Sequence, residues 1–97
     1  MATIPLVLAA RIIPVDPSAL RRTLNRFGLN DRQEDGQRVV DLAVVKLFQR
    51  TRAASGYLAP YWLRTRDDLL AAAAAIPASE IDELAEACEL SQQQPAA

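Results

Sequence analysis

The apolar segment over residues 39–48 constrains the fold of this chain most. Only two of its residues are polar, so its apolar side chains cover most of the circumference of a helix. A helix of that kind must be covered on most sides by other elements. We therefore predict a central buried helix here. It begins near Asp31, which has capping-box spacing to Glu34, and it ends at Gly56.

The N-terminal segment over residues 3–15 is the strand candidate. A short, continuous apolar run that is rich in Ile and Val favours a strand over a helix. Pro5 restricts such a strand to the edge of a sheet or to its own beginning. Because no other segment reads as a strand, we expect this strand, or an extended arm, to pair across a dimer axis or with a partner protein.

The next helix is predicted over residues 17–27. Asp16 is a good N-cap, and Pro17 suits the first helical position. From Leu20 onward, apolar residues recur at helical spacing on one face. Gly28 is placed to end the helix in the left-handed conformation.

Two further helices complete the expected fold. Thr65 caps the first of them, which Pro77 ends, and Ser79 caps the last. Residues 91–97 have nothing to bury, and we expect them to form a disordered tail. The predicted architecture is a single, mainly α-helical domain over residues 1–90, with about four helices around the central helix.

Composition bounds the class of protein. Apolar residues make up 51% and charged residues 24% of the 97 residues, which is ordinary for a soluble globular domain. The single cysteine cannot form an internal disulfide and favours a reducing compartment. No basic segment precedes the apolar N-terminal run, and no run approaches the ~18 apolar residues of a membrane span. We expect a cytoplasmic protein that does not enter a membrane.

The charges are segregated along the chain. Residues 1–66 carry all eleven Lys and Arg against five acids, whereas residues 67–97 carry seven acids and no base. The net charge of −1 therefore joins a segment of +6 to one of −7. Such asymmetry bears on partners rather than on the fold.

The residues that most enzymes use are missing. The chain has no histidine, and its three glycines form no phosphate-binding loop. Cys88 lies on the apolar face of the last helix beside four acids, which would raise its pKa and disfavour the thiolate. We predict a protein that is not an enzyme and that holds neither a cofactor nor a metal.

An aromatic group marks a candidate protein-binding site. Three of the five aromatic residues fall within six positions and are followed by two arginines. Tyr, Trp and Arg are enriched in the residues that dominate interface energies. The candidate partner-binding residues are Tyr57, Tyr61, Trp62, Arg64 and Arg66. The alternative is that these rings cover the core where the chain turns, with Tyr61 and Trp62 half-buried.

A second set of residues indicates DNA. Ten of the eleven bases are arginine, whose planar fork suits phosphate. The candidate nucleic-acid-binding residues are Arg11, Arg21, Arg22 and Arg26. The alternative is that the arginines pair with the acidic C-terminal helix of the same chain or of a dimer mate.

Two DNA-binding arrangements were considered. Helix 17–27 and Gly28 look like the first helix and turn of a helix-turn-helix, but the polar residues 32–38 cannot start its second helix. The order of strand, helix, turn and longer helix fits a ribbon-helix-helix analogy better, although the strand offers few polar side chains to read base edges.

The leading hypothesis is a non-catalytic protein–protein interaction module. It would be a small adaptor or inhibitor, of the kind found among immunity factors, that occludes the surface of a macromolecular partner. The alternative is a homodimeric DNA-binding transcriptional regulator, antitoxin-like, with its basic N-terminal half on DNA and its acidic C-terminal half on a protein. The sequence does not identify the partner.

Overall fold

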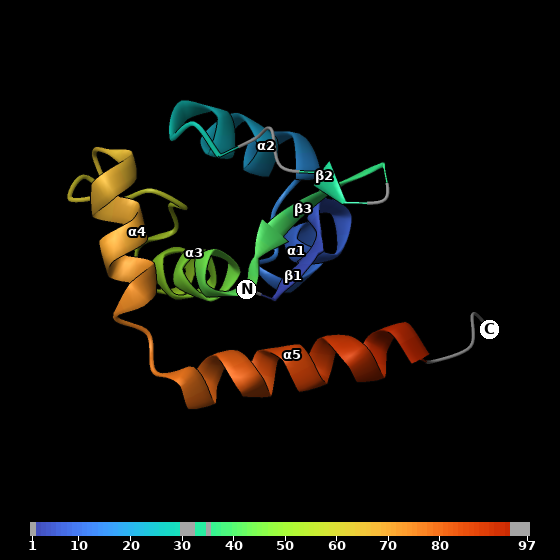
Figure 1. The fold of residues 1–97 in the computed structure, drawn as a ribbon. Helices are drawn as coiled ribbons and strands as arrows, with labels where there is room; N and C mark the ends of the chain where they lie inside the picture. The colour runs from blue at the N-terminus through green and yellow to red at the C-terminus, as the bar shows by residue number, and fades with distance from the viewer. Residues whose placement is uncertain (1, 30–32, 35, 94–97) are drawn as a thin grey trace.

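The computed structural model describes residues 2–29, 33–34 and 36–93. That part of the chain is mainly helical, with five helices and a small three-stranded antiparallel sheet (Figure 1), so the predicted mainly α-helical class is confirmed. The elements in chain order are β1 (Thr3–Pro5), α1 (Leu6–Ile12), α2 (Pro17–Arg26), β2 (Gln33–Glu34), β3 (Gln37–Asp41), α3 (Leu42–Ser55), α4 (Arg66–Ala74) and α5 (Ala78–Gln93).

The strand predicted over residues 3–15 is wrong for most of its length. β1 ends at Pro5, and α1 begins at the next residue. The buried positions Leu6, Ala9 and Ile13 recur at the spacing of one helical face. That period was hidden in the sequence because all the residues between them except Arg11 are also apolar.

The mate of β1 lies within the same chain. β1 runs antiparallel to β3, with Thr3 opposite Asp41 and Pro5 opposite Val39. The strand order β1-β3-β2 makes β1 an edge strand, which agrees with the position expected for Pro5. The expectation that this strand pairs across a dimer axis or with a partner is corrected, and an unpaired strand no longer argues for association.

The helix predicted over residues 39–48 is wrong at its start. The valines before Asp41 belong to β3, and α3 begins only at Leu42. β-branched residues suit a strand that is paired on both sides, as β3 is. Asp31, the predicted start, lies outside the described residues. α3 ends at Gly56, whose φ of +81° is the predicted left-handed conformation.

β2 and β3 form a tight hairpin that the sequence analysis missed. Glu34 lies opposite Gln37, so two residues connect the strands. Gly36 has a φ of +77°, which a residue with a side chain rarely adopts. The sequence Asp35-Gly36 is typical of two-residue hairpin loops, and this signal was available from the sequence.

The hydrophobic core joins α3 to most other elements. α3 contacts α1, β3, α4 and α5. The largest side chains that are fully buried come from α2, α3, α4 and the connection before α4, and they are Leu20, Val45, Phe48, Leu63 and Leu69.

α2 has the boundaries that the sequence predicts. The side chain of Asp16 accepts a hydrogen bond from the backbone N–H of Ser18 at 2.8 Å. At the other end, the N–H of Leu29 donates to the carbonyl of Leu24 at 2.9 Å, and Gly28 has a φ of +72°. These contacts form a Schellman motif and satisfy carbonyls that the helix end leaves unpaired.

The C-terminal half agrees with the sequence in part. Thr65 caps α4 in a reciprocal capping box with Asp68. α5 begins at Ala78, so Ser79 lies inside the helix instead of capping it. Residues 91–93, assigned above to the tail, belong to α5, and residues 94–97 lie outside the described part. Among the described helices, none combines the length and apolarity needed to cross a membrane.

Candidate functional site

α1 and α2 form a compact two-helix unit near the N-terminus. The four residues 13–16 connect them, and the two helices pack against each other. Leu20 and Leu24 bury one face of α2 in the core. Two packed helices joined by a three- or four-residue turn occur in helical hairpins and in the helix-turn-helix of DNA-binding proteins. α2 is the second helix of this unit, whereas the sequence analysis considered it as the first. The ribbon-helix-helix analogy is corrected, because α1 separates β1 from α2.

The outer face of α2 is polar and exposed. Its side chains include two arginines at its centre, Arg21 and Arg22, as well as Ser18 and Asn25. Within residues 2–29, 33–34 and 36–93, no carboxylate lies within ion-pair distance of Arg21 or Arg22. Arg26 is also exposed, but its guanidinium lies over the ring of Phe27, 5.0 Å from the centroid.

Polar side chains of the hairpin lie beside the start of α2. A pocket of about 460 Å³ separates them, with Ser18 and Arg21 on one wall and Gln37 and Arg38 on another. Arg11 is exposed in the last turn of α1. Arg11, Arg21, Arg22 and Arg26 therefore all belong to the two-helix unit. The sequence analysis missed Ser18, Asn25 and the hairpin residues because it did not recognise α1.

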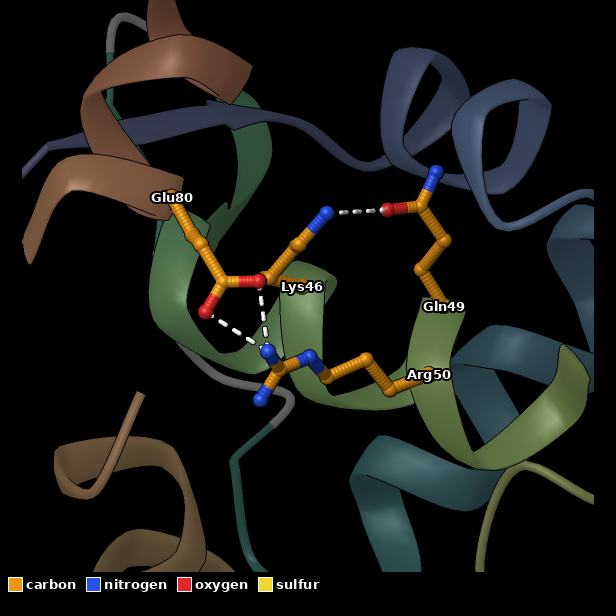
Figure 2. A network of polar contacts seen from close by, with 4 residues as sticks. All are labelled: Lys46, Gln49, Arg50 and Glu80. Carbon is orange, nitrogen blue, oxygen red and sulfur yellow. Dashed lines mark hydrogen bonds and ion pairs between the residues drawn. The ribbon is translucent and has the colours of Figure 1, made fainter. Parts of the chain in front are cut away.

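The predicted pairing between the acidic helix and the chain's own arginines occurs at Arg50. Its Nη2 atom contacts both carboxylate oxygens of Glu80, at 2.5 and 2.6 Å (Figure 2). The later acids of α5 are exposed, and none contacts an arginine of the part that the structure describes. They are Asp82, Glu83, Glu86 and Glu89. Since Figure 1 places α2 and α5 on opposite sides of the molecule, α5 does not neutralise the arginines of α2.

A polar chain along α3 links it to α1. Lys46 donates to Oε1 of Gln49 at 3.2 Å (Figure 2), and Nε2 of Gln49 donates to the carbonyl of Ile12 at 3.4 Å. Ile12 is the last residue of α1, so these hydrogen bonds fix the end of α1 against α3.

The connection between α3 and α4 presents the predicted aromatic group to solvent. Leu58 and Leu63 are buried and anchor the connection. The side chains of Tyr57, Tyr61 and Trp62 are 70%, 91% and 49% exposed. The alternative in which the rings cover the core does not describe Tyr61, whose side chain is almost entirely in solvent.

A hydroxyl inside the core holds this connection in place. Thr51 is a buried polar residue of α3, and its Oγ1 donates to the carbonyl of Leu58 at 2.7 Å. The same oxygen lies 3.1 Å from the carbonyl of Phe48. Because a buried carbonyl without a donor is costly, Thr51 fixes the path of the chain just before the exposed rings.

An apolar groove of about 380 Å³ lies beside Trp62. α3 forms one wall, and α4 with the residues after it forms the other. Three alanines, Ala54, Ala72 and Ala75, line it together with larger apolar side chains such as Leu47. The half-exposed ring of Trp62 thus borders a hollow, where an incoming apolar side chain would find contacts on several sides.

The two predicted arginines, Arg64 and Arg66, follow Trp62 closely in the sequence and are exposed. Arg64 precedes the cap of α4, and its backbone N–H donates to Oδ2 of Asp68 at 3.2 Å. The N–H of Thr65 donates to the same oxygen at 3.0 Å. These bonds, that from Thr65 first, hold the pKa of Asp68 below its usual value of 3.8. Arg66 makes no ion pair with any acid of the described residues.

The single cysteine and the carboxylates were the other residues considered for chemistry. Cys88 is buried, and burial raises the pKa of its thiol. The sequence analysis gave the same direction but assigned it to neighbouring carboxylates. Among the described residues, no group of three or more His, Cys, Asp or Glu side chains is arranged to hold a metal ion.

Comparison with known protein families, with curated proteins and with solved structures finds no match to this chain.

Proposed function

We propose that this protein binds DNA through the two-helix unit of α1 and α2. The observation that carries the proposal is the exposed face of α2, where Arg21 and Arg22 have no carboxylate partner among the described residues. In a helix-turn-helix, the second helix lies in the major groove, where its exposed side chains meet the base edges. The function inferred is that of a non-catalytic DNA-binding regulator.

The residue types on α2 suit this role. Arginine binds the O6 and N7 acceptors of guanine with two hydrogen bonds, and asparagine binds the matching donor and acceptor of adenine. Arg21 and Asn25 are therefore the proposed base-reading residues, and Arg22 is proposed to contact a phosphate. Arg11, on the first helix, is proposed to contact a phosphate, because that helix crosses the DNA backbone. Gln37 and Arg38 on the hairpin are proposed to contact the flanking backbone.

The binding measurement uses fluorescence anisotropy of labelled duplexes of mixed sequence, titrated with the protein over a range of salt concentrations. The logarithm of the association constant should fall linearly with the logarithm of the salt concentration. Replacing a phosphate-contacting arginine lowers that slope by about one unit. We expect this result for Arg22→Ala. Arg66→Ala removes the same charge from α4 and is the matched control.

Base reading is tested by selecting preferred sequences from a random duplex library. The Asn25→Ala variant should keep general affinity while it loses preference at one position, by about 1–3 kcal/mol. If binding is weak and independent of salt, or if Arg66→Ala and Arg22→Ala lower the slope equally, α2 is not the DNA-binding element. The number of protein chains bound per selected duplex also tests whether the protein binds as a homodimer, which stays a prediction.

A second candidate function is the protein–protein interaction module that the sequence favours, acting as a small adaptor or inhibitor. The exposure of Tyr57, Tyr61 and Trp62 supports it, since large aromatic side chains in solvent are typical of binding surfaces. The two functions use different residues of the chain and are compatible. Native mass spectrometry of complexes isolated with the wild type and with Trp62→Ala tests this candidate. The arrangement of the other helices around α3 and a cytoplasmic location also stay predictions.

A further inference from the structure

The pocket of about 460 Å³ near the start of α2 has the size of a small-molecule site, for which about 300–1,000 Å³ is typical. It lies where β1, α1, α2 and β3 meet, and each of these elements contributes lining residues. The lining has an apolar part and a polar part. A ligand that is apolar at one end and charged at the other matches such a lining.

The apolar part of the lining is formed by Pro5, Leu6, Val7 and Pro17. Val7 is 57% exposed, although the preceding Leu6 is buried. An exposed apolar side chain is ordinary by itself, but Val7 lies in a hollow between two prolines, where one ligand contacts all three. Covering this surface removes apolar area from water, which is the main favourable term in association.

The polar part of the lining holds a cation without a partner. The guanidinium of Arg21 makes no ion pair or hydrogen bond with the residues that the structure describes. The second lining cation, Arg38, already has a partner in the chain, so Arg21 is the group that can take up the charge of a ligand. Ser18 and Gln37 also line the pocket, and their hydroxyl and amide groups can donate hydrogen bonds to the same ligand.

The charges at the start of α2 favour a carboxylate over a phosphate. A guanidinium binds a carboxylate through two parallel hydrogen bonds and balances its single charge. Asp16 lies at the same end of α2, where its carboxylate accepts a hydrogen bond from the N–H of Ser18. A dianionic phosphate would bring a second negative charge close to Asp16 and would be repelled by it.

We infer that this pocket binds a small organic monocarboxylate, whose carboxylate pairs with Arg21 and whose apolar body covers Val7. Because Arg21 is also a proposed base-reading residue, the bound carboxylate competes with DNA for it. The competition rests on the proposed function, whereas the binding of the carboxylate does not.

NMR titration of the nitrogen-labelled protein with naphthoate tests the binding. Naphthoate joins one carboxylate to an apolar ring system, and naphthylmethanol carries the same rings without the charge. We expect naphthoate to shift the amide signals of Val7 and Ser18 until they saturate. It should bind about tenfold more tightly than naphthylmethanol, because it adds hydrogen bonds to a charged group. Naphthyl phosphate should bind no more tightly than naphthoate, and the indole N–H of Trp62, beside the other groove, should not shift.

Two neighbouring arginines provide a matched pair of variants. Arg21 lines the pocket and Arg22 does not, yet both are exposed at the centre of α2. Arg21→Gln should weaken naphthoate binding about tenfold, whereas Arg22→Gln should bind naphthoate as the wild type does. Val7→Ser keeps the charge and removes apolar surface, so it should weaken binding about fivefold. The spectrum of each variant checks that the fold is intact.

Fluorescence anisotropy of a labelled duplex measures the competition. At a naphthoate concentration ten times its own dissociation constant, mutually exclusive binding should weaken the affinity for DNA about tenfold. Sodium acetate at the same concentration is the control for added salt, which by itself weakens DNA binding.

The outcomes separate the two steps. The binding is overturned by absence of saturation, by equal affinity for naphthoate and naphthylmethanol, by shifts at Trp62 instead of Val7, or by equal effects of Arg21→Gln and Arg22→Gln. Tighter binding of naphthyl phosphate would overturn the choice of a carboxylate. If naphthoate binds but DNA affinity stays the same, the competition is wrong and the proposed function survives. If the protein binds no DNA, the proposed function and the competition both fail, and the NMR titration still decides whether the pocket is a carboxylate site.

Discussion

Arg50 and Glu80 join α3 to the first turn of α5 through a single guanidinium nitrogen that contacts both carboxylate oxygens. The side chains remain 49% and 28% exposed. Partly exposed pairs of this kind contribute little, because water and salt screen them and two long side chains must be held still.

Glu80→Gln should therefore lower the free energy of unfolding by no more than about 1 kcal/mol, and by less at high salt. Urea unfolding at two salt concentrations measures both effects. Glu86 is an exposed acid of the same helix without an arginine partner in the described part. If Glu86→Gln costs as much as Glu80→Gln, the ion pair contributes nothing specific.

Two substitutions of Asp16 separate its role as the N-cap of α2 from the effect of its negative charge. Asp16→Ala removes the acceptor for the N–H of Ser18 and should cost about 1 kcal/mol of stability. Asp16→Asn keeps a capping oxygen and removes a negative charge next to the proposed DNA-reading face. It should leave stability nearly unchanged and tighten DNA binding, as measured by thermal unfolding and anisotropy. An Asn variant that binds DNA no more tightly would place the start of α2 away from the DNA.

The cap of α4 should depend on pH. Since the pKa of Asp68 is lower in the folded chain than its ordinary 3.8, the ionised carboxylate stabilises the fold. This contribution is fully present above pH 3.8 and is lost as the pH falls through the lower, folded-state pKa. NMR titration of the Asp68 carboxyl measures that pKa directly. Asp68→Asn should remove this group's part of the acid sensitivity, and an unaltered acid profile would contradict the assignment.

The buried hydroxyl of Thr51 gives a test of how the aromatic connection is held. Thr51→Val keeps the shape but leaves the carbonyl of Leu58 without its donor, which should cost about 1–3 kcal/mol. Thr51→Ser keeps the hydroxyl and is the control for the hydrogen bond. Trp62 emission, read at the same time, should change in the Val variant and much less in the Ser variant.

Local signals predicted both ends of α2, the end of α3 and the start of α4. Asp16 and Gly28 bound α2, and Thr65 caps α4, because capping depends on a side chain and the two or three residues beside it. Such contacts are short in sequence, so the residues themselves specify them.

The strands could not be placed in the same way. β3 lies in an apolar run that continues directly into α3, so the change from strand to helix at Leu42 leaves no break in the pattern. What decides it is pairing with β1, which comes from a distant part of the sequence. Tertiary pairing overrides local preference in such segments. Asp35-Gly36 was a local clue to the hairpin, and it was missed.

The same difference between local and long-range signals applies to the candidate sites. The exposed aromatic group was predicted because it is continuous in sequence and rich in interface residue types. The proposed DNA-reading face was predicted only as a set of arginines, without Ser18 and Asn25, because the two-helix unit becomes visible only once α1 is recognised. Charge alone identifies a kind of partner, but the geometry of α1 and α2 identifies which side chains would meet it.

The pairing of Thr3 with Asp41 has a consequence for how the protein is made. The chain leaves the ribosome N-terminus first, so β1 emerges well before its mate β3. Closing the loop between them carries an entropic cost that only the completed pairing repays. The two-helix unit is therefore synthesised early, and a nascent chain that stalls before residue 41 would display α1 and α2 before β3 has paired with β1 and packed against α1.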